Sequence, residues 1–305
     1  MPSRELQTLL TVFRARPRRG GTVAPIERVR ADFEAFQAAL RAPTDFTAEP
    51  ISAGGVPAEW IVPHGPRPER TVLFFHGGGY ASGSLGTHRA LVARIARATP
   101  ARVLQVGYRL APEDPFPAAF EDARAAYRWL LDTGVEPATL AVGGDSAGGG
   151  LSLALLCAAR DAGEPLPAAW FGLSPWTDLG HTGESIVTRA EQDPLFTPES
   201  LEGMAALYAG DHPRTHPAIS PLFADLHDLP PGLLQVGTAE LLLDDSTRLA
   251  RRLEAAGVTV ELDVWESMFH GWQLFASMLP EGQQALEQVA AFVRRNTAVA
   301  AEVRP

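Results

Sequence analysis

The chain has 305 residues, 46% hydrophobic and 20% charged, an ordinary composition for a globular protein with a sizeable core. Its net charge of −10 argues against nucleic acid or an anionic membrane as partner, and no stretch is apolar for long enough to span a bilayer. Because Cys157 is the only cysteine and no secretory leader is recognisable, we expect no disulfide and a cytoplasmic location.

The chain opens on helices. Apolar residues at spacings of three and four predict a helix over residues 25–41, and a shorter apolar series predicts another one before it. Residues 1–45 are therefore expected to form N-terminal helices that precede every strand.

From about residue 47, short apolar runs alternate with stretches of helix length. The predicted strands are 60–62, 71–75, 103–106, 140–142, 169–173, 233–236 and 258–264, and the predicted helices are 87–98, 118–132, 147–161 and 244–256. Such alternation indicates a mostly parallel sheet covered on both faces, with only the early strands antiparallel. The last strand is expected to lie at a sheet edge, where two chains would pair into a homodimer.

One segment interrupts the alternation. Residues 180–222 are rich in Pro, Gly, His and Thr, with one helical stretch near 198–208. An insertion of this kind in an open sheet lies at the carboxyl ends of the strands, where ligands bind. We therefore predict a core of residues 46–179 and 223–305, and a lid made of residues 180–222 and the N-terminal helices.

A nucleophile is predicted where a strand turns into a helix. Residues 144–148 read Gly-Asp-Ser-Ala-Gly between the predicted strand 140–142 and the following helix. The turn strains the backbone of its central residue, and Gly144 and Gly148 omit Cβ atoms that would collide. The hydroxyl of Ser146 is then exposed at a helix N-terminus, which favours developing negative charge.

A second glycine-rich motif, His-Gly-Gly-Gly at residues 76–79, directly follows a predicted strand. Glycines let backbone N–H groups approach a substrate oxygen without side chains in the way. We expect Gly78 and Gly79, together with the N–H of Ala147, to form an oxyanion hole. His76 is expected to orient this loop and not to transfer protons.

The general base is expected to follow Ser146 in the chain. The histidines between residues 181 and 227 lie in the irregular segment or just after it. His270 instead follows the last predicted strand, where a loop can hold an imidazole over the serine. His212 and His216 lack the carboxylates of a metal site in helical register, so neither a metal nor another cofactor is expected.

The acid is expected after the strand 233–236. Glu240 is the first carboxylate past the end of this strand, and its role would be to orient and stabilise His270. Asp244 and Asp245 lead into a helix, where an N-terminal carboxylate has an ordinary capping role. Glu240 is therefore the predicted acid, and Asp244 is the alternative.

With these motifs in order, the sequence resembles the bacterial hormone-sensitive-lipase-type esterases, also called family IV. The resemblance extends from about residue 20 almost to the C-terminus and rests on four segments, namely 76–79, Tyr-Arg-Leu-Ala-Pro-Glu at 108–113, 144–148, and Met-Phe-His-Gly at 268–271. It implies an eight-stranded α/β-hydrolase core flanked by helices, a helical cap, and hydrolysis of short- to medium-chain carboxylic esters.

The acid motif departs from the usual pattern of that family. The family has Asp-Pro-Leu-x-Asp, whereas residues 240–244 read Glu-Leu-Leu-Leu-Asp. The sequence is similar to a subgroup that keeps a glutamate there, some of whose members are named esterases or monoterpene ε-lactone hydrolases. Hydrolysis of a lactone, amide or carbamate with the same triad is therefore the alternative reaction.

Two further hypotheses concern the site and the class of protein. Apolar pocket residues are expected among large side chains near the motifs, with core packing as the alternative for each: Tyr80, Trp176, Phe196, Leu222 and Trp272. A non-catalytic small-molecule receptor of the same fold would lack the histidine, and this chain has His270. A long-chain lipase would need an amphipathic lid with large apolar residues, which residues 180–222 do not provide.

Overall fold

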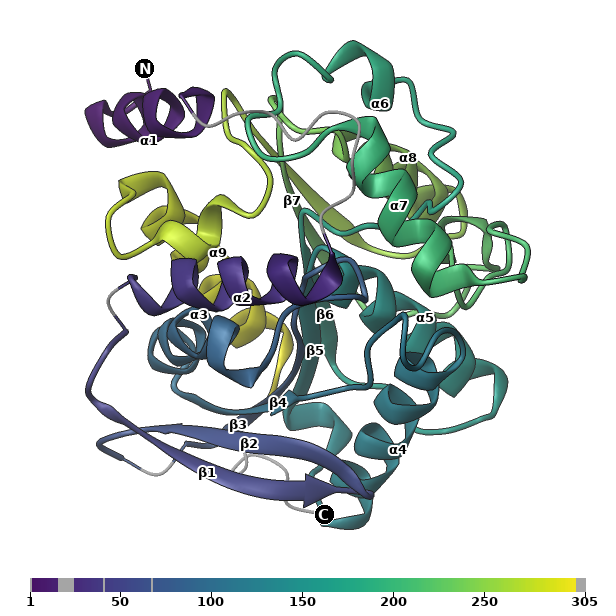
Figure 1. Ribbon diagram of the computed structural model, residues 1–305. Coiled ribbons are helices and arrows are strands. Elements are labelled where there is room, and N and C mark those ends of the chain that lie inside the picture. Colours follow the sequence, from purple (N-terminus) through teal and green to yellow (C-terminus); the bar gives the residue numbers. More distant parts are fainter. Residues whose placement is uncertain (1, 16–24, 41, 67, 300–305) are drawn as a thin grey trace.

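In the described part of the chain, residues 2–15, 25–40, 42–66 and 68–299, the computed structural model contains one eight-stranded sheet in the order β1-β2-β4-β3-β5-β6-β7-β8 (Figure 1). The strands are β1 (Phe46–Ala53), β2 (Val56–Pro63), β3 (Arg70–Phe75), β4 (Ala101–Val106), β5 (Leu140–Asp145), β6 (Ala169–Leu173), β7 (Gly232–Gly237) and β8 (Val260–Trp265). The β1–β2 and β2–β4 pairs are antiparallel, and the pairs from β4–β3 to β7–β8 are parallel. The predicted α/β-hydrolase sheet, with its early antiparallel strands and β8 at an edge, is confirmed.

Strand β1 is missing from the sequence predictions. Its residues alternate only weakly in hydrophobicity and include Glu49 and Pro50. Because β1 is an edge strand, it tolerates a proline that has no N–H to donate. The other strands agree with the predicted runs, apart from a few residues at their ends.

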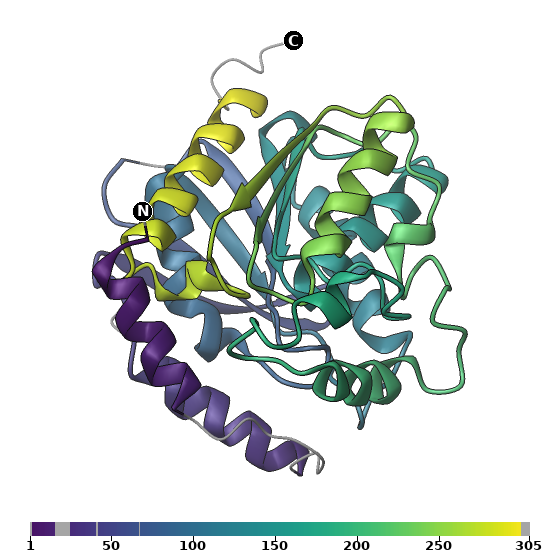
Figure 2. The same cartoon turned by 90° about the horizontal axis from the view of Figure 1, so that it is seen from above.

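Helices cover both faces of the sheet (Figure 2). Residues of β3 alternate between these faces, since Val72 and Phe74 pack in one core cluster and Leu73 and Phe75 in the other. The first cluster lies under α3 (Leu85–Ala98) and α9 (Pro280–Asn296), and the second under α4 (Ala118–Asp132), α5 (Ala147–Asp161) and α8 (Leu243–Ala255). Helix α9 is absent from the predictions, although its buried residues recur at helical spacing, from Ala285 to Val293.

The N-terminal helices α1 (Arg4–Arg14) and α2 (Ile26–Ala38) lie where the sequence predicts them. Phe13 of α1 packs edge-on against Phe269, with ring centroids 5.2 Å apart. Arg30 of α2 donates from Nε to the carbonyl of Ala81, at 2.8 Å. Both helices therefore contact loops at the carboxyl end of the sheet. Helix α1 packs against the loop that carries His270, so its role is not limited to that of a lid.

The insertion after β6 carries α6 (Ser185–Thr188), α7 (Pro198–Ala209) and the 3₁₀ turn η2 (Pro221–Phe223). Helix α7 agrees with the helical stretch predicted near 198–208. It begins at Pro198 and is preceded by a capping box in which Thr197 and Ser200 exchange hydrogen bonds. Two other 3₁₀ turns are η1 (Pro137–Thr139), just before β5, and η3 (Trp272–Phe275), after β8.

The division into residues 1–45, a core of 46–179 and 223–305, and a cap of 180–222 stays a prediction. Residues 1, 16–24 and 41 of the first segment, and residues 67 and 300–305 of the core, lie outside the described residues. Among the helices that are described, none is both long and apolar enough to cross a membrane.

Candidate active site

Ser146 lies at the sharp turn between β5 and α5. Its backbone has φ 52° and ψ −121°, a strained conformation for a residue other than glycine. A Cβ on Gly144 would lie 2.4 Å from the carbonyl carbon of Gly148, and a Cβ on Gly148 would lie 1.9 Å from the carbonyl oxygen of Phe75. Both glycines are therefore required by the turn, for the reason expected from the sequence.

The glycine loop follows β3 directly. Gly78 and Gly79 have φ of 120° and 64°, and a Cβ on Gly78 would lie 2.1 Å from the carbonyl oxygen of Ser82. Among the described residues, the N–H groups of Gly78, Gly79 and Ala147 donate no hydrogen bond to a protein acceptor. These three N–H groups remain available to a substrate oxygen.

Two buried side chains hold the glycine loop in place. The carboxylate of Asp145 accepts a hydrogen bond from the N–H of Gly77 at 2.9 Å and contacts Nε2 of His88 at 3.2 Å. The ring of His76 stacks on Tyr108, with centroids 4.3 Å apart. Burial, together with the neighbouring His88, lowers the pKa of His76 to about 4, so this imidazole is neutral at physiological pH. These contacts of Asp145 and His76 are structural, in line with the orienting role expected of His76.

His270 and Glu240 lie in contact. Nδ1 of His270 is 2.7 Å from Oε2 of Glu240, which is fully buried. Burial by itself would lower the pKa of His270, but the hydrogen bond and charge of Glu240, with the charges of Asp193 and Asp145, raise it above the ordinary value. The loop after β8 thus brings the predicted base onto the predicted acid.

Ser174 is a residue of this site that the sequence predictions do not include. Its Oγ donates to Oε1 of Glu240 at 2.8 Å and accepts from the N–H of Gly271 at 3.3 Å. The N–H of Gly237 also donates to Oε1 of Glu240, at 2.6 Å. One sequence signal was available, since Ser174 directly follows the predicted strand 169–173.

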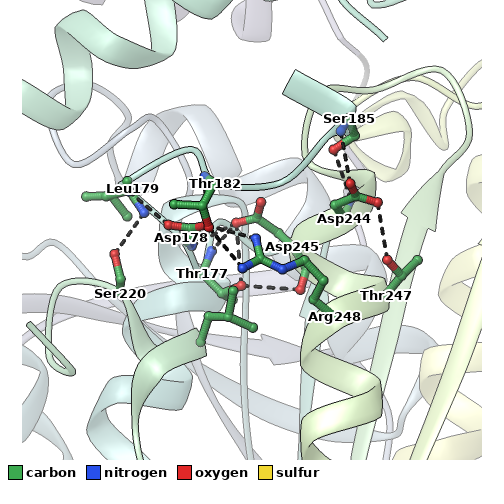
Figure 3. A network of polar contacts seen from close by, with 12 residues as sticks. Thr177, Asp178, Leu179, Thr182, Ser185, Ser220, Asp244, Asp245, Thr247 and Arg248 are labelled. Carbon is green, nitrogen blue, oxygen red and sulfur yellow. Dashed lines mark hydrogen bonds and ion pairs between the residues drawn. The ribbon is translucent and has the colours of Figure 1, made fainter. Parts of the chain in front are cut away.

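The expected capping role of Asp244 and Asp245 is wrong. Both lie in the first turn of α8, whose N-cap residue is Leu242 and has no side-chain cap. Oδ2 of Asp244 instead accepts from the N–H of Ser185 at 2.9 Å (Figure 3). Oδ2 of Asp245 accepts from the N–H of Thr177 at 2.7 Å. The N–H groups of Thr177 and Ser185 require an acceptor because a buried N–H without a hydrogen bond is costly, and these carboxylates supply it.

These aspartates belong to a polar network at the base of the insertion. Asp178 is fully buried and pairs with Arg248 at 3.0 Å, close to Asp245 (Figure 3). Burial, with the adjacent charge of Asp178, raises the pKa of Asp245 to about 8. The network fastens the start of the insertion to α8.

The five predicted pocket residues are placed differently from one another. Phe196 is half-buried and packs edge-on against His270, with centroids 5.0 Å apart. Tyr80, Trp176 and Leu222 are buried in the core cluster that contains α5. Trp272 packs in a separate cluster with the residues of α1, so core packing describes its contacts.

Met204 of α7 is a second site residue without a sequence prediction. A Cβ built on Gly79 would lie 2.2 Å from Sδ of Met204, so this side chain covers the glycine loop. Phe196 and Met204 thus place the insertion over both His270 and the glycine loop. Within the described residues, no group of three or more His, Cys, Asp and Glu side chains is arranged to hold a metal ion.

The known proteins that this chain resembles are hydrolases of one fold. A family model for the alpha/beta hydrolase fold matches residues 72–274. An acetyl-hydrolase of Streptomyces hygroscopicus is 46% identical over 248 residues, which make up 81% of this chain and 82% of that protein.

Two solved structures are similar over nearly the whole chain. An esterase from the bacterial hormone-sensitive lipase family is 47% identical with a TM-score of 0.93, covering 98% of this chain and 100% of its own. The esterase EstE5, soaked with p-nitrophenyl butyrate, is 45% identical with a TM-score of 0.93, covering 96% of this chain and 99% of its own.

Proposed function

The chain belongs to the alpha/beta hydrolase family, among the bacterial hormone-sensitive-lipase-type esterases, and we propose that it hydrolyses short- to medium-chain esters through Ser146, His270 and Glu240. It is a serine ester hydrolase. One observation carries the residue assignment, namely the 2.7 Å contact between Nδ1 of His270 and the buried Oε2 of Glu240. A carboxylate on Nδ1 fixes the tautomer in which Nε2 accepts a proton.

Acylation begins with the hydroxyl of Ser146. Nε2 of His270 takes the hydroxyl proton while Oγ attacks the ester carbonyl, and Glu240 stabilises the resulting imidazolium without being protonated itself. The N–H groups of Gly78, Gly79 and Ala147 donate to the oxyanion, and one such donor is typically worth about 3 kcal/mol. His270 then returns the proton to the alkoxide, which leaves as an alcohol.

Deacylation repeats the same transfers with water. His270 takes a proton from water as the water oxygen attacks the acyl-enzyme carbonyl, and the same N–H groups hold the second oxyanion. Ser146 leaves with the proton from His270, and the carboxylic acid is released. The chain thereby supplies nucleophile, base and oxyanion donors from its own residues.

The insertion above the site favours a pocket that accepts only short- to medium-chain acyl groups. Phe196 packs on His270 and Met204 covers Gly79, so the insertion closes over the reacting groups. The names of the relatives agree, since one is called an acetyl-hydrolase and the EstE5 structure was soaked with a butyrate ester.

We propose a small-molecule acyl ester as substrate and a homodimer through the exposed edge of β8.

A p-nitrophenyl ester series from acetate to laurate tests the proposed acyl preference. Each buried CH₂ adds about 0.8 kcal/mol, so kcat/KM should rise until the pocket is full and fall beyond it. We expect the maximum between acetate and octanoate. A maximum at decanoate or laurate would instead indicate a long-chain lipase. The same series with Ser146→Ala supplies the background rate.

The bond that is cleaved is tested by two matched substrates. We expect p-nitrophenyl butyrate to react far faster than p-nitrobutyranilide, because an alkoxide or phenoxide leaves more easily than an amine. Equal rates would favour an amidase, and ε-caprolactone hydrolysed faster than every acyclic ester would favour a lactonase.

The pH dependence of kcat/KM follows from the contacts of His270. Only the neutral imidazole can accept the proton of Ser146, and Glu240, Asp193 and Asp145 raise the pKa of His270 against the effect of burial. We therefore expect activity to be lost as the pH falls, along an acid limb above the ordinary histidine value of about 6.5. The measurement is kcat/KM for p-nitrophenyl acetate at constant ionic strength, and an acid limb below that value would contradict the assignment.

A further inference from the structure

The segment that follows Glu240 is held by side chains of the insertion. The N–H of Leu241, the next residue, donates to Oδ2 of Asp193 at 2.9 Å. The carbonyl of Leu241 accepts from Oγ of Ser185 at 2.6 Å. Asp193 and Ser185 lie in the insertion, and both are buried. Both backbone groups of the residue beside Glu240 are thus fixed by partners 48 and 56 positions earlier in the chain.

Ser185 also holds the start of α8. Its N–H donates to Oδ2 of Asp244 at 2.9 Å, and its Oγ accepts from the N–H of Asp244 at 3.1 Å (Figure 3). One serine of α6 therefore bonds both to Leu241, just after Glu240, and to Asp244, in the first turn of α8. Residues 240–242, between β7 and α8, form no helix or strand, whereas Asp244 already belongs to α8.

Asp193 connects the acid loop to the base. Its Oδ1 accepts from the N–H groups of Leu195 and Phe196, at 2.9 and 3.0 Å. Phe196 in turn packs edge-on against the ring of His270. A single buried carboxylate therefore links the residue beside Glu240 with the side chain that lies against His270.

We propose that Asp193 and Ser185 are positioning residues of the catalytic site, which hold Glu240 through Leu241 and, for Asp193, steady His270 through Phe196. This inference rests on the proposed roles of Glu240 and His270. The insertion would then orient Glu240 as well as cover the substrate. Charge-assisted hydrogen bonds to buried backbone donors suit this task, because they are short and directional.

The charge of Asp193 affects the pKa of His270, and therefore the pH dependence of kcat/KM. The charged groups that act on His270 are Glu240 from the loop after β7, Asp193 from the insertion and Asp145 at the end of β5. Burial raises the pKa of Asp193, while its three N–H donors and the positive charge of His270 oppose that rise. Removal of this carboxylate should lower the pKa of His270 and move the acid limb of kcat/KM to lower pH. Ser185 carries no charge, and its removal should leave the limb in place.

The experiment compares Asp193→Asn and Ser185→Ala with a matched control. Asp211→Asn removes the same charge from an exposed position of the insertion. We expect kcat for p-nitrophenyl butyrate to fall about ten- to hundredfold in Asp193→Asn and Ser185→Ala, with a smaller change in KM, since small displacements of catalytic groups have effects of this size. Circular dichroism and Tm report folding, and the pH profile of each variant completes the set.

The outcomes separate this inference from the triad assignment when Glu240→Gln is measured in parallel. If both variants match Asp211→Asn in kcat while Glu240→Gln is nearly inactive, the positioning role is wrong and the triad stands. If Glu240→Gln keeps wild-type kcat, the triad proposal itself fails. A loss of kcat with an unmoved acid limb in Asp193→Asn overturns the action of its charge on His270. Should Asp193→Asn not fold, the kcat of Ser185→Ala decides whether the insertion positions Glu240.

Discussion

Ser146→Ala is expected to lower kcat for p-nitrophenyl butyrate by about 10⁴-fold or more, the largest effect of any single substitution here. Methyl for hydroxymethyl removes the atom that attacks the carbonyl, while the N–H groups of Gly78, Gly79 and Ala147 keep their positions. KM for residual turnover should change far less, because the hydroxyl contributes little to substrate binding in the ground state. Initial rates with purified protein, corrected for spontaneous hydrolysis, give both constants.

A covalent probe makes the same prediction independently of turnover. Phenylmethanesulfonyl fluoride should add one sulfonyl group to the wild-type chain in intact-mass spectra, and none to Ser146→Ala, since the nucleophile is the reacting atom. Ser52→Ala is the matched control, because Ser52 is exposed on β1 at the sheet edge opposite β8. Wild-type turnover in Ser146→Ala, or labelling of that variant at the wild-type rate, would contradict the assignment of the nucleophile.

Glu240→Gln is expected to lower kcat by about 10³- to 10⁴-fold, the second-largest effect. A glutamine is almost the same size and keeps one oxygen, but its neutral amide neither stabilises the imidazolium nor selects the required tautomer. Oε1 of Glu240 also accepts from Gly237 and Ser174, so an amide oxygen placed there leaves NH₂ against Nδ1 of His270. Residual activity should show its acid limb at lower pH than the wild type, because a charge that raises the pKa of His270 is gone.

Two further variants distinguish the acid from its neighbours. Glu254→Gln makes the same chemical change at an exposed position of α8 and is the control. Asp244→Asn tests the alternative acid, whose Oδ2 bonds to the N–H of Ser185. We expect Asp244→Asn to keep far more activity than Glu240→Gln. The reverse order would show that the acid is Asp244.

The parts of the site that the sequence predicted best are local. The turn at Ser146 needs Gly144 and Gly148 because Cβ atoms there would meet backbone within a few residues or on the adjacent strand β3. Such requirements leave short motifs that can be recognised without coordinates. The alternation of apolar strands and amphipathic helices likewise predicts the confirmed fold class. Among the strands and α-helices of the described residues, the weakly patterned β1, the four-residue α6 and the C-terminal α9 were not predicted.

Contacts between distant segments could not be derived in the same way. Whether Glu240 or Asp244 faces His270 depends on how the loop after β7 is held, and its partners Ser174, Ser185 and Asp193 are each ordinary residues in the sequence. Leu241 and Asp193 are 48 positions apart, and Ser174 and Gly271 are 97 apart. The sheet order places the carboxyl ends of β5 to β8 side by side, and that order appears only in the folded molecule.

The amino-acid sequence by itself therefore determined a mostly parallel sheet covered on both faces, the strained serine turn and the glycine loop, because backbone sterics and hydrophobic periodicity act over a few residues. Only the tertiary structure decided the contact between Glu240 and His270, the packing of Trp272 with residues of α1, and the hydrogen bonds of Asp193 and Ser185 to Leu241. Those outcomes depend on which side chains meet after the chain has folded, and a single hydrogen bond across the sheet leaves no periodic or local trace in the sequence.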